Sequence, residues 1–144
     1  MQTRGSREPV LLDTSAALAF VVADHRDHDA TFVALADRRL GLAGHAAFET
    51  FSVLTRLPSP ARRTAAAVTR LLGANFPETR FLSAKRSAEL LDELAGHGIA
   101  GGSVYDALVG AAAAEHELTL ATRDRRALGT YRELGVDVQL IQAH

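Results

Sequence analysis

The sequence predicts an α/β fold, in which a parallel central sheet of about five short strands lies between helices in three layers. Short apolar segments alternate with longer helical segments along the chain, which is typical of strand–helix–strand units. The 144 residues are 47% hydrophobic and 23% charged, which suits one ordinary domain with a buried core. In addition, Asp13 and Asp124 follow predicted strands, where an open parallel sheet gathers its reactive groups. We expect a mobile polar lead-in over residues 1–9 and a single domain over 10–144.

The N-terminal part supplies the first two strands. The apolar triplet VLL predicts a strand over 10–12, and a helix over 14–23 opens directly behind Asp13. A second helix over 28–38 leads to a brief strand over 40–43.

Two prolines mark helix boundaries in the middle of the chain. A helix over 46–57 ends at Pro58, and a helix over 61–74 follows Pro60, at a position where a missing N–H costs nothing. Residues 80–82 are strand-like.

The C-terminal part continues the alternation. An amphipathic helix over 84–97 is stopped by Gly98, and an almost wholly apolar helix follows over 103–117. The remaining elements are a buried strand over 118–122, a helix over 125–134 closed by Gly135, and a last alternating strand over 136–141.

Composition excludes several function classes. With no cysteine, the chain has no disulfide, no thiolate nucleophile and no Cys-based zinc site, which suits a reducing cytosol. The formal net charge of −1 provides no overall positive field, so any binding of nucleic acid depends on a local patch. Asp13 interrupts the apolar N-terminal stretch, and no apolar run reaches the ~18 residues of a membrane span. We expect a cytoplasmic protein without membrane contact.

Four acids occupy positions that need an explanation. Asp13 and Asp124 project from the carboxyl ends of predicted strands, Asp106 begins an apolar helix, and Glu49 lies within another helix. Taken singly, each has a structural interpretation. Asp13 and Asp124 suit N-caps, Asp106 stands three residues after Ser103 as in a capping box, and Glu49 suits a solvent-facing position.

Convergence of the four acids points to a metal ion. Two carboxylates ~4 Å apart repel by about 4 kcal/mol at an effective dielectric of ~20, whereas an N-cap bond returns only ~1 kcal/mol. Either some of the acids are protonated, or a divalent cation neutralises them. Because only oxygen ligands are on offer, the suitable ions are Mg²⁺ or Mn²⁺.

The surroundings of two of these acids fit a site. Small residues such as Gly110 lie on the same face as Asp106 and either leave space beside its carboxylate or serve close helix packing. Apolar residues cover most of the other helix and leave one narrow polar stripe, made of His45, Glu49, Ser52 and Arg56.

Three blocks in this order, VLLDTSAALA, HAAFETFSVLTRLP and GGSVYDALVGAAAAEHELTLATRD, resemble the PIN-domain ribonucleases. More narrowly, they resemble the VapC toxins of bacterial toxin–antitoxin pairs, and the likeness runs from Val10 to about Ile141. The resemblance implies an α/β/α domain and a metal-dependent endoribonuclease. Such a toxin hydrolyses phosphodiester bonds in structured RNA (tRNA, rRNA or mRNA) and thereby inhibits translation and growth.

The resemblance also assigns site residues. The hydroxyl of the family's T-x-D element falls on Thr122, and Thr14 and Ser15 follow the first aspartate, beside the ligands. Of the four acids, Glu49 either ligates a second metal ion or orients the attacking water. The family's acidic positions, catalytic and metal-binding, fall on Asp13, Glu49, Asp106 and Asp124.

RNA must approach this acidic site, so cationic groups are expected around it. For Arg125 and Arg126 a solvated helix face is the competing interpretation. The candidates are Arg56, Arg62, Arg63, Arg123, Arg125 and Arg126.

Similarity to VapC further implies a homodimer and a cognate VapB-type antitoxin that lies across an apolar groove. The groove is expected to be lined from Phe48, Phe51, Leu54 and the helix over 61–74. Alternatively these residues are ordinary core, which we favour for Phe48 and Phe51.

Other families fit less well. A haloacid-dehalogenase-type phosphatase carries a second Asp where this chain has Ser15, and a response-regulator receiver has adjacent early acids and a late lysine. The only lysine here is Lys85. A catalytically silent PIN module that binds RNA or protein stays open as the alternative.

Overall fold

The structure is a computed structural model that describes residues 8–142. Its sheet has four parallel strands in the order β2-β1-β3-β4, with β1 and β3 at the centre. The register pairs Leu11 of β1 with Gly41 on one side and with Leu120 on the other. The strands are β1 (Val10–Leu12), β2 (Leu40–Leu42), β3 (Thr119–Thr122) and β4 (Val138–Leu140).

The expected fifth strand at 80–82 is wrong: this segment contributes a single bridge, between Ala43 and Arg80. The segment that contains Glu78 passes very close to the backbone of the edge strand β2. A Cβ atom on Gly41 would lie 2.2 Å from the backbone of Glu78, so only glycine permits this approach. After the bridge, the backbone turns away into the next helix.

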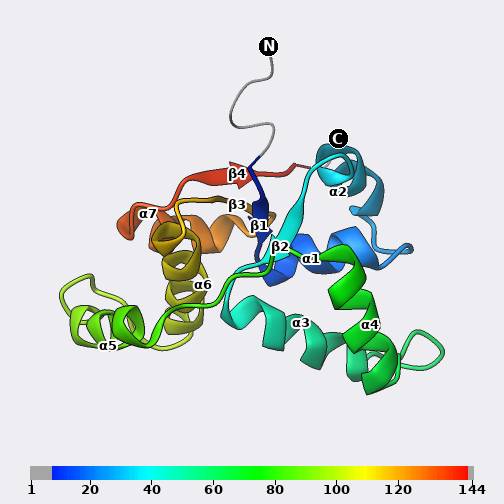
Figure 1. The fold of residues 1–144 in the computed structure, drawn as a ribbon, viewed down its shortest axis with the longest axis horizontal. Helices are drawn as coiled ribbons and strands as arrows, with labels where there is room; N and C mark the ends of the chain where they lie inside the picture. The colour runs from blue at the N-terminus through cyan, green and yellow to red at the C-terminus, as the bar shows by residue number, and fades with distance from the viewer. Residues whose placement is uncertain (1–7, 143–144) are drawn as a thin grey trace, which may run out of the picture.

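Helices cover both faces of the sheet, as the three-layer expectation requires (Figure 1). The side chains of Val10 and Leu12 point to one layer, and that of Leu11 points to the other. The first layer holds α1 (Thr14–Val21), α2 (His28–Leu35) and α4 (Ala65–Asn75), and the second holds α6 (Ser103–Glu115) and α7 (Leu128–Glu133).

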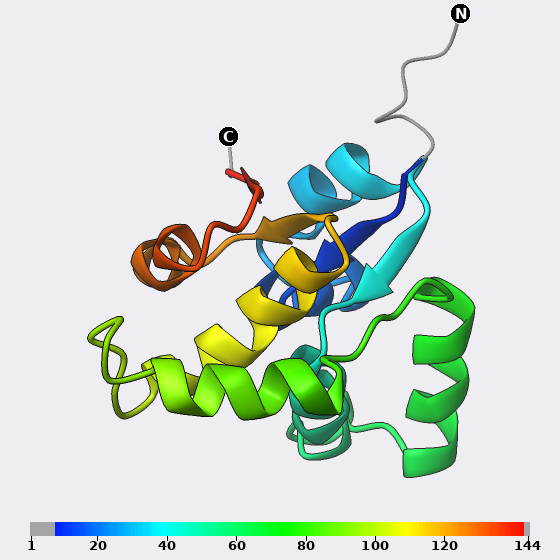
Figure 2. The same cartoon turned by 60° about the vertical axis from the view of Figure 1, so that its left-hand side comes forward.

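Two further helices extend this sandwich. The α5 helix (Ala84–Glu93) packs on the outer side of α6 through Leu90 and Ala107, and the two helices lie side by side in Figure 2. The α3 helix (His45–Thr55) lies beyond the carboxyl ends of the strands (Figure 1). It therefore reaches the edge at which the sequence predicts a site.

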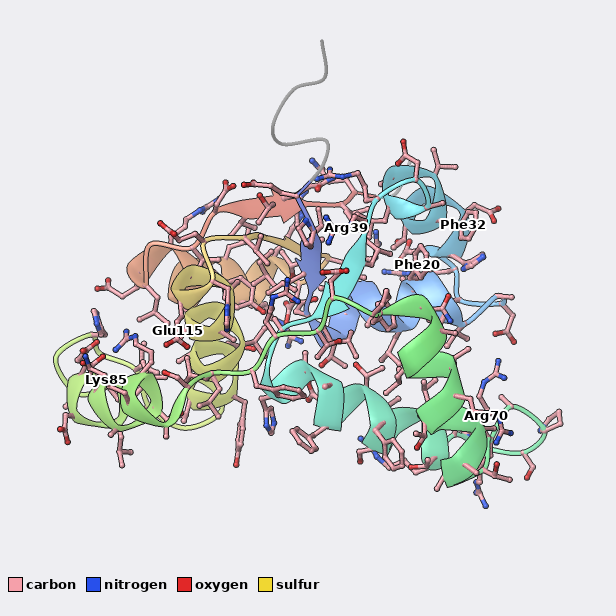
Figure 3. All side chains as sticks on the ribbon, in the orientation of Figure 1. Phe20, Phe32, Arg39, Arg70, Lys85 and Glu115 are labelled. Carbon is pink, nitrogen blue, oxygen red and sulfur yellow. The ribbon has the colours of Figure 1, made fainter. Side chains whose placement is uncertain are left out.

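Aromatic packing fixes the first layer. Phe20 of α1 stacks on Phe32 of α2 with ring centroids 5.4 Å apart. Both residues are labelled in Figure 3. Phe20 also contacts Phe76, which follows α4. The Phe20 ring thus links α1 with α2 and with the end of α4.

Several predicted boundaries differ. The α4 helix begins at Ala65 rather than at 61, because the Thr64 hydroxyl accepts the N-capping bond from Ala67, and residues 61–63 stay exposed. The predicted helix over 125–134 is divided into a 3₁₀ turn, η2 (Arg125–Ala127), and the short α7.

The expected lead-in over 1–9 lies outside the described residues up to residue 7. Its last residue, Pro9, is buried. In the described part of the chain, every helix is too short or too polar to cross a membrane.

Candidate active site

A pocket of about 290 Å³ brings together the four predicted acids. It lies at the carboxyl ends of the strands, between α1, α3 and α6. The predicted neighbours Thr14 and Ser15 also line it, whereas Thr122 lies just behind it, in contact with Asp13. The lining residues are Asp13, Thr14, Ser15, Leu18, Glu49, Gly102, Tyr105, Asp106, Val109, Asp124 and Tyr131.

Asp13 is the most buried of the four acids, with 4% of its surface exposed. Its Oδ1 accepts hydrogen bonds from the Ser15 hydroxyl at 2.6 Å and from the Ala16 amide at 3.1 Å, which caps α1. Its Oδ2 accepts from the hydroxyls of Thr122 and Tyr131. Within the described chain no cationic side chain contacts Asp13. Burial raises the pKa of its carboxyl, and the hydrogen bonds only partly offset this effect.

Tyr131 is a site residue that sequence reasoning missed. It is 1% exposed, and its hydroxyl donates to Asp13 at 2.8 Å. Burial and then the Asp13 charge raise the pKa of this phenol, so it stays a proton donor. A Cβ on Gly110 would lie 3.0 Å from the Tyr131 ring, so the small residue on α6 serves close packing. A lone tyrosine in the last helix carries no sequence signal for this contact.

Asp106 lies in the first turn of α6, half-buried, and makes no hydrogen bond or ion pair with any described residue. The capping-box interpretation is wrong, because Gly102 is the N-cap of α6 and no side chain caps this helix. Burial raises the pKa of Asp106, and the charges of Asp124, Asp13 and Glu49 raise it further. This carboxyl is destabilised in its ionised form by the other three acids.

Glu49 and Asp124 complete the lining of the pocket by acids. Glu49 is exposed on α3, and the Thr14 hydroxyl donates to its Oε1 at 2.5 Å. Asp124 follows β3 and caps η2 by accepting a bond from the Arg126 amide at 3.0 Å. Asp124 therefore caps a helix and also lines the pocket, as Asp13 does.

Ser15 and Thr122 connect the segment that follows β1 with the end of β3. The Ser15 hydroxyl donates to Asp13 and accepts a bond from the Arg123 amide at 2.9 Å. The Thr122 hydroxyl donates to Asp13 and accepts from the Asp124 amide at 3.0 Å. These two hydroxyls fix Asp13 relative to Asp124.

The chemistry of the donor set fits a hard divalent ion. The four acids offer carboxylate oxygens alone, which are the ligands of Mg²⁺ and Mn²⁺. Among residues 8–142, however, no three His, Asp or Glu side chains already stand in an arrangement that could hold a metal ion. Both oxygens of Asp13 face hydrogen-bond donors, and the carboxylates repel one another. Ligation thus requires rotation of side chains within the pocket, which is easiest for the unbonded Asp106.

The predicted arginines divide into two groups. Arg123, Arg125 and Arg126 lie near Asp124, where they line a neighbouring cavity. Arg123 is already engaged: its guanidinium forms an ion pair with Asp27 at 2.5 Å. The others, Arg56, Arg62 and Arg63, do not line the acidic pocket.

The residues expected in an apolar groove are not equally accessible. Phe48 is 67% exposed and contacts Phe81, so its interpretation as core is wrong. Phe51 is half-buried, whereas Leu54 is completely buried and cannot line a groove.

Residues 10–133 match the protein family described as the PIN domain. The ribonuclease VapC27 of Mycobacterium tuberculosis (strain ATCC 25618 / H37Rv) is 46% identical over 132 residues, which cover 92% of this chain and 96% of that protein. The ribonuclease VapC40 of the same species is 43% identical over 131 residues, which cover 90% and 96% respectively.

Solved structures share the fold at lower identity. VapBC2 from Rickettsia felis, bound to a DNA fragment from its promoter, matches with a TM-score of 0.67 at 15% identity and covers 94% of this chain and 100% of that chain. FitAcB from Neisseria gonorrhoeae matches with a TM-score of 0.63 at 19% identity, covering 90% and 95%. At such identities the likeness establishes the fold alone.

Proposed function

The chain belongs to the PIN-domain family, in its VapC-type branch, and on this premise we propose that it is a metal-dependent endoribonuclease, the toxin of a toxin–antitoxin pair. The observation that supports this most strongly is the pocket lined by Asp13, Glu49, Asp106 and Asp124, to which no described cation is bonded except the peripheral Arg126. Relatives at 43–46% identity that are named ribonucleases support the activity.

In the proposed mechanism, Asp13, Asp106 and Asp124 would hold Mg²⁺ or Mn²⁺ in the pocket. Bound there, the ion would supply Lewis acidity for phosphodiester hydrolysis and would offset the charge that develops in the transition state. Glu49 either ligates a second ion or orients the attacking water. It suits the latter role because Thr14 holds one of its oxygens and leaves the other available.

Three residues behind the acidic pocket hold the carboxylate of Asp13 in position. Ser15, Thr122 and Tyr131 donate to Asp13, so its carboxylate is fixed before substrate arrives. Such positioning makes reorganisation during the reaction small. Asp106 has no such support, and is the ligand we expect to move most when the ion binds.

A cognate antitoxin and a second copy of the chain are the proposed partners. The similar structures named VapBC2 and FitAcB support the first of these. Exposed aromatic side chains near α3 support an interface, namely Phe48 at 67%, Phe81 at 52% and Tyr105 at 56% exposure. Sedimentation of the purified chain tests the dimer, and co-purification with the product of a neighbouring small gene tests the antitoxin.

Cleavage of a structured RNA by the purified chain tests the activity. We expect cleavage in the presence of Mn²⁺ or Mg²⁺, loss of cleavage with a chelator, and loss in Asp106→Asn. The matched control is Asp92→Asn, which removes an exposed carboxylate of α5 and is expected to cleave normally. RNA binding without cleavage by the wild-type protein would instead favour the silent PIN module.

Growth provides the cellular test. Expression of the chain alone is expected to arrest bacterial growth, and expression of Asp13→Ala is not. Equal toxicity of the two chains contradicts nuclease action.

A further inference from the structure

A second cavity, of about 430 Å³, opens directly beside the acidic pocket. Asp124 lines both, so the two cavities share a wall. Four arginines surround the second one. Its lining residues are Arg26, Arg123, Asp124, Arg125, Arg126, Leu140, Ile141 and Gln142.

The charges of this cavity are unbalanced. Asp27 pairs with Arg123 at 2.5 Å and also contacts Arg26 at 3.3 Å, so one carboxylate serves two guanidinium groups. Arg125 donates to the neutral amide of Gln142 at 2.6 Å. Arg126 lies 3.6 Å from Asp124. Four guanidinium groups therefore meet only two carboxylates, beside a pocket whose own charge is negative.

Three of the four arginines have exposed side chains that a ligand can reach. The side chains of Arg26 and Arg126 are 89% and 95% exposed, and Arg125 is exposed as well. Arg123 differs, since its side chain is 10% exposed and also donates to the Ile141 carbonyl at 3.0 Å. Arg123 holds Asp27, which in turn contacts the neighbouring Arg26 at 3.3 Å.

We propose that the RNA strand leaves the acidic pocket on this side, with the phosphates that flank the scissile bond lying against Arg26, Arg125 and Arg126. The inference rests on the proposed nuclease function and adds a direction to it. Arginine suits this role because its planar fork bonds two phosphate oxygens at once. Phosphate contacts of this kind position a strand without reading its sequence.

The neighbouring surface offers room for more than one nucleotide. Between α2 and β4 lies a cavity of about 710 Å³, which continues from the second one because both are lined by Arg26, Leu140, Ile141 and Gln142. The predicted pair Arg62 and Arg63, in the connection between α3 and α4, lines neither cavity. The structure therefore favours the β4 side over the α3–α4 side for the strand.

The double variant Arg26→Ala/Arg125→Ala tests this path. In an Asp106→Asn background, we expect its Kd for a single-stranded RNA of about twelve nucleotides to rise roughly tenfold. The negative slope of the logarithm of the binding constant against the logarithm of the salt concentration should become shallower by about 1.4. Each lost contact with single-stranded nucleic acid removes about 0.7 from its magnitude. In the active background, kcat/KM for the same RNA should fall by a similar factor. Cleavage of a diribonucleotide, which ends at the acidic pocket, should change less than about twofold.

Two matched double variants sharpen the result. Arg70→Ala/Lys85→Ala removes two exposed cations at opposite ends of the molecule (Figure 3) and is expected to bind RNA as the parent does. Arg62→Ala/Arg63→Ala removes the alternative path. Equal weakening in the Arg70/Lys85 variant, or weakening in the Arg62/Arg63 variant alone, overturns the proposal.

Failure of the proposed function gives a different pattern. If the wild-type protein cleaves neither substrate with Mn²⁺, the nuclease assignment fails, yet the binding measurements still decide the path. If cleavage occurs and Arg26→Ala/Arg125→Ala matches wild type with both substrates, the nuclease assignment stands and the path is wrong.

Discussion

Asp13 and Asp27 are both buried, at 4% and 7% exposure, but their surroundings differ in kind. Asp27 receives the guanidinium of Arg123 at 2.5 Å and that of Arg26 at 3.3 Å. Burial alone raises the pKa of Asp27, but these arginines outweigh it and hold the pKa below its usual value. Asp13 receives hydroxyl and amide donors only, and its pKa is raised.

The difference separates a carboxylate that is paired within the chain from one that we propose to be functional. A buried ion pair is complete within the chain and costs stability when one partner is removed. Asp13 has neutral donors and three acidic neighbours in its pocket, which agrees with the proposal that an external cation balances its charge. Arg123 directly follows Thr122, which contacts Asp13, yet its guanidinium is bound to Asp27 rather than to Asp13.

The largest expected difference between the two aspartates is in catalysis. Asp13→Asn is expected to lower kcat/KM for RNA cleavage by about 10²–10³-fold, because it removes the charge of a proposed metal ligand. Asp27→Asn should cleave a diribonucleotide within about threefold of the wild-type rate, since it lies outside the acidic pocket. Both are measured with Mn²⁺ below the melting temperature of the variants. Similar losses in the two variants would remove the distinction.

For stability we expect the opposite order: Asp27→Asn should be more damaging than Asp13→Asn. Asp27→Asn leaves the largely buried Arg123 without its partner and should lower the melting temperature by more than about 5 °C. The double variant Asp27→Asn/Arg123→Met should melt above the Asp27→Asn single variant, because it removes both charges. Asp13→Asn should lower the melting temperature less than Asp27→Asn does, since its amide oxygen can still cap α1. Additive losses in the double variant contradict the pairing.

The pH dependence of stability sharpens the contrast. In the metal-free protein the pKa of Asp106 is raised above 3.8, chiefly by burial and then by the charges of Asp124 and Asp13. The folded state then binds its proton more tightly than the unfolded state, so stability falls as the pH rises through the raised pKa. Asp106→Asn should therefore melt a few degrees above wild type at neutral pH and equal to it below about pH 4.

The contribution of Asp27 to stability depends on pH in the opposite direction. Because its pKa is lowered from 3.8, the stability it provides is present above that value and is lost as the pH falls through the lower, folded-state value.

Millimolar Mn²⁺ is expected to raise the melting temperature of the wild type and not that of Asp106→Asn. Scanning calorimetry with and without chelator measures both effects. A lower melting temperature of Asp106→Asn at neutral pH would mark Asp106 as a structural residue.

The smallest expected effect concerns a donor behind Asp13. Tyr131→Phe removes one buried hydroxyl and leaves an Asp13 oxygen with one fewer bond, which costs about 1 kcal/mol of unfolding free energy. Cleavage should fall by up to about tenfold, since Asp13 is less well held. Denaturant unfolding and kcat/KM are the measurements. Tyr105→Phe is the control for stability, because its ring is 56% exposed.

The acids themselves were predictable because each is tied to an element that the sequence reveals. Asp13 follows β1 and Asp124 follows β3, and parallel strands bring such residues to one edge. Asp106 was predictable from its isolation in an apolar helix. Local signals failed elsewhere: Pro60 predicted a helix start that Thr64 provides instead, and the strand-like residues 80–82 contribute only one bridge.

Partners across the fold were not predictable. Arg123 carries the same local pattern as its neighbours, yet it is buried against Asp27 at a separation that no local rule covers. Phe48 has the character of a core residue and is largely exposed, because the packed face of α3 is formed by Ala46, Thr50 and Leu54.

By itself the sequence determined the layer architecture and the identity of the acids, since the periodicity of apolar residues and the places where strands end are local properties of the chain. The tertiary structure alone decided which charges are neutralised. Tyr131 reaches Asp13 through the space that Gly110 leaves, and Arg123 turns to Asp27, because burial and electrostatic pairing depend on distances between segments that the order of residues does not contain.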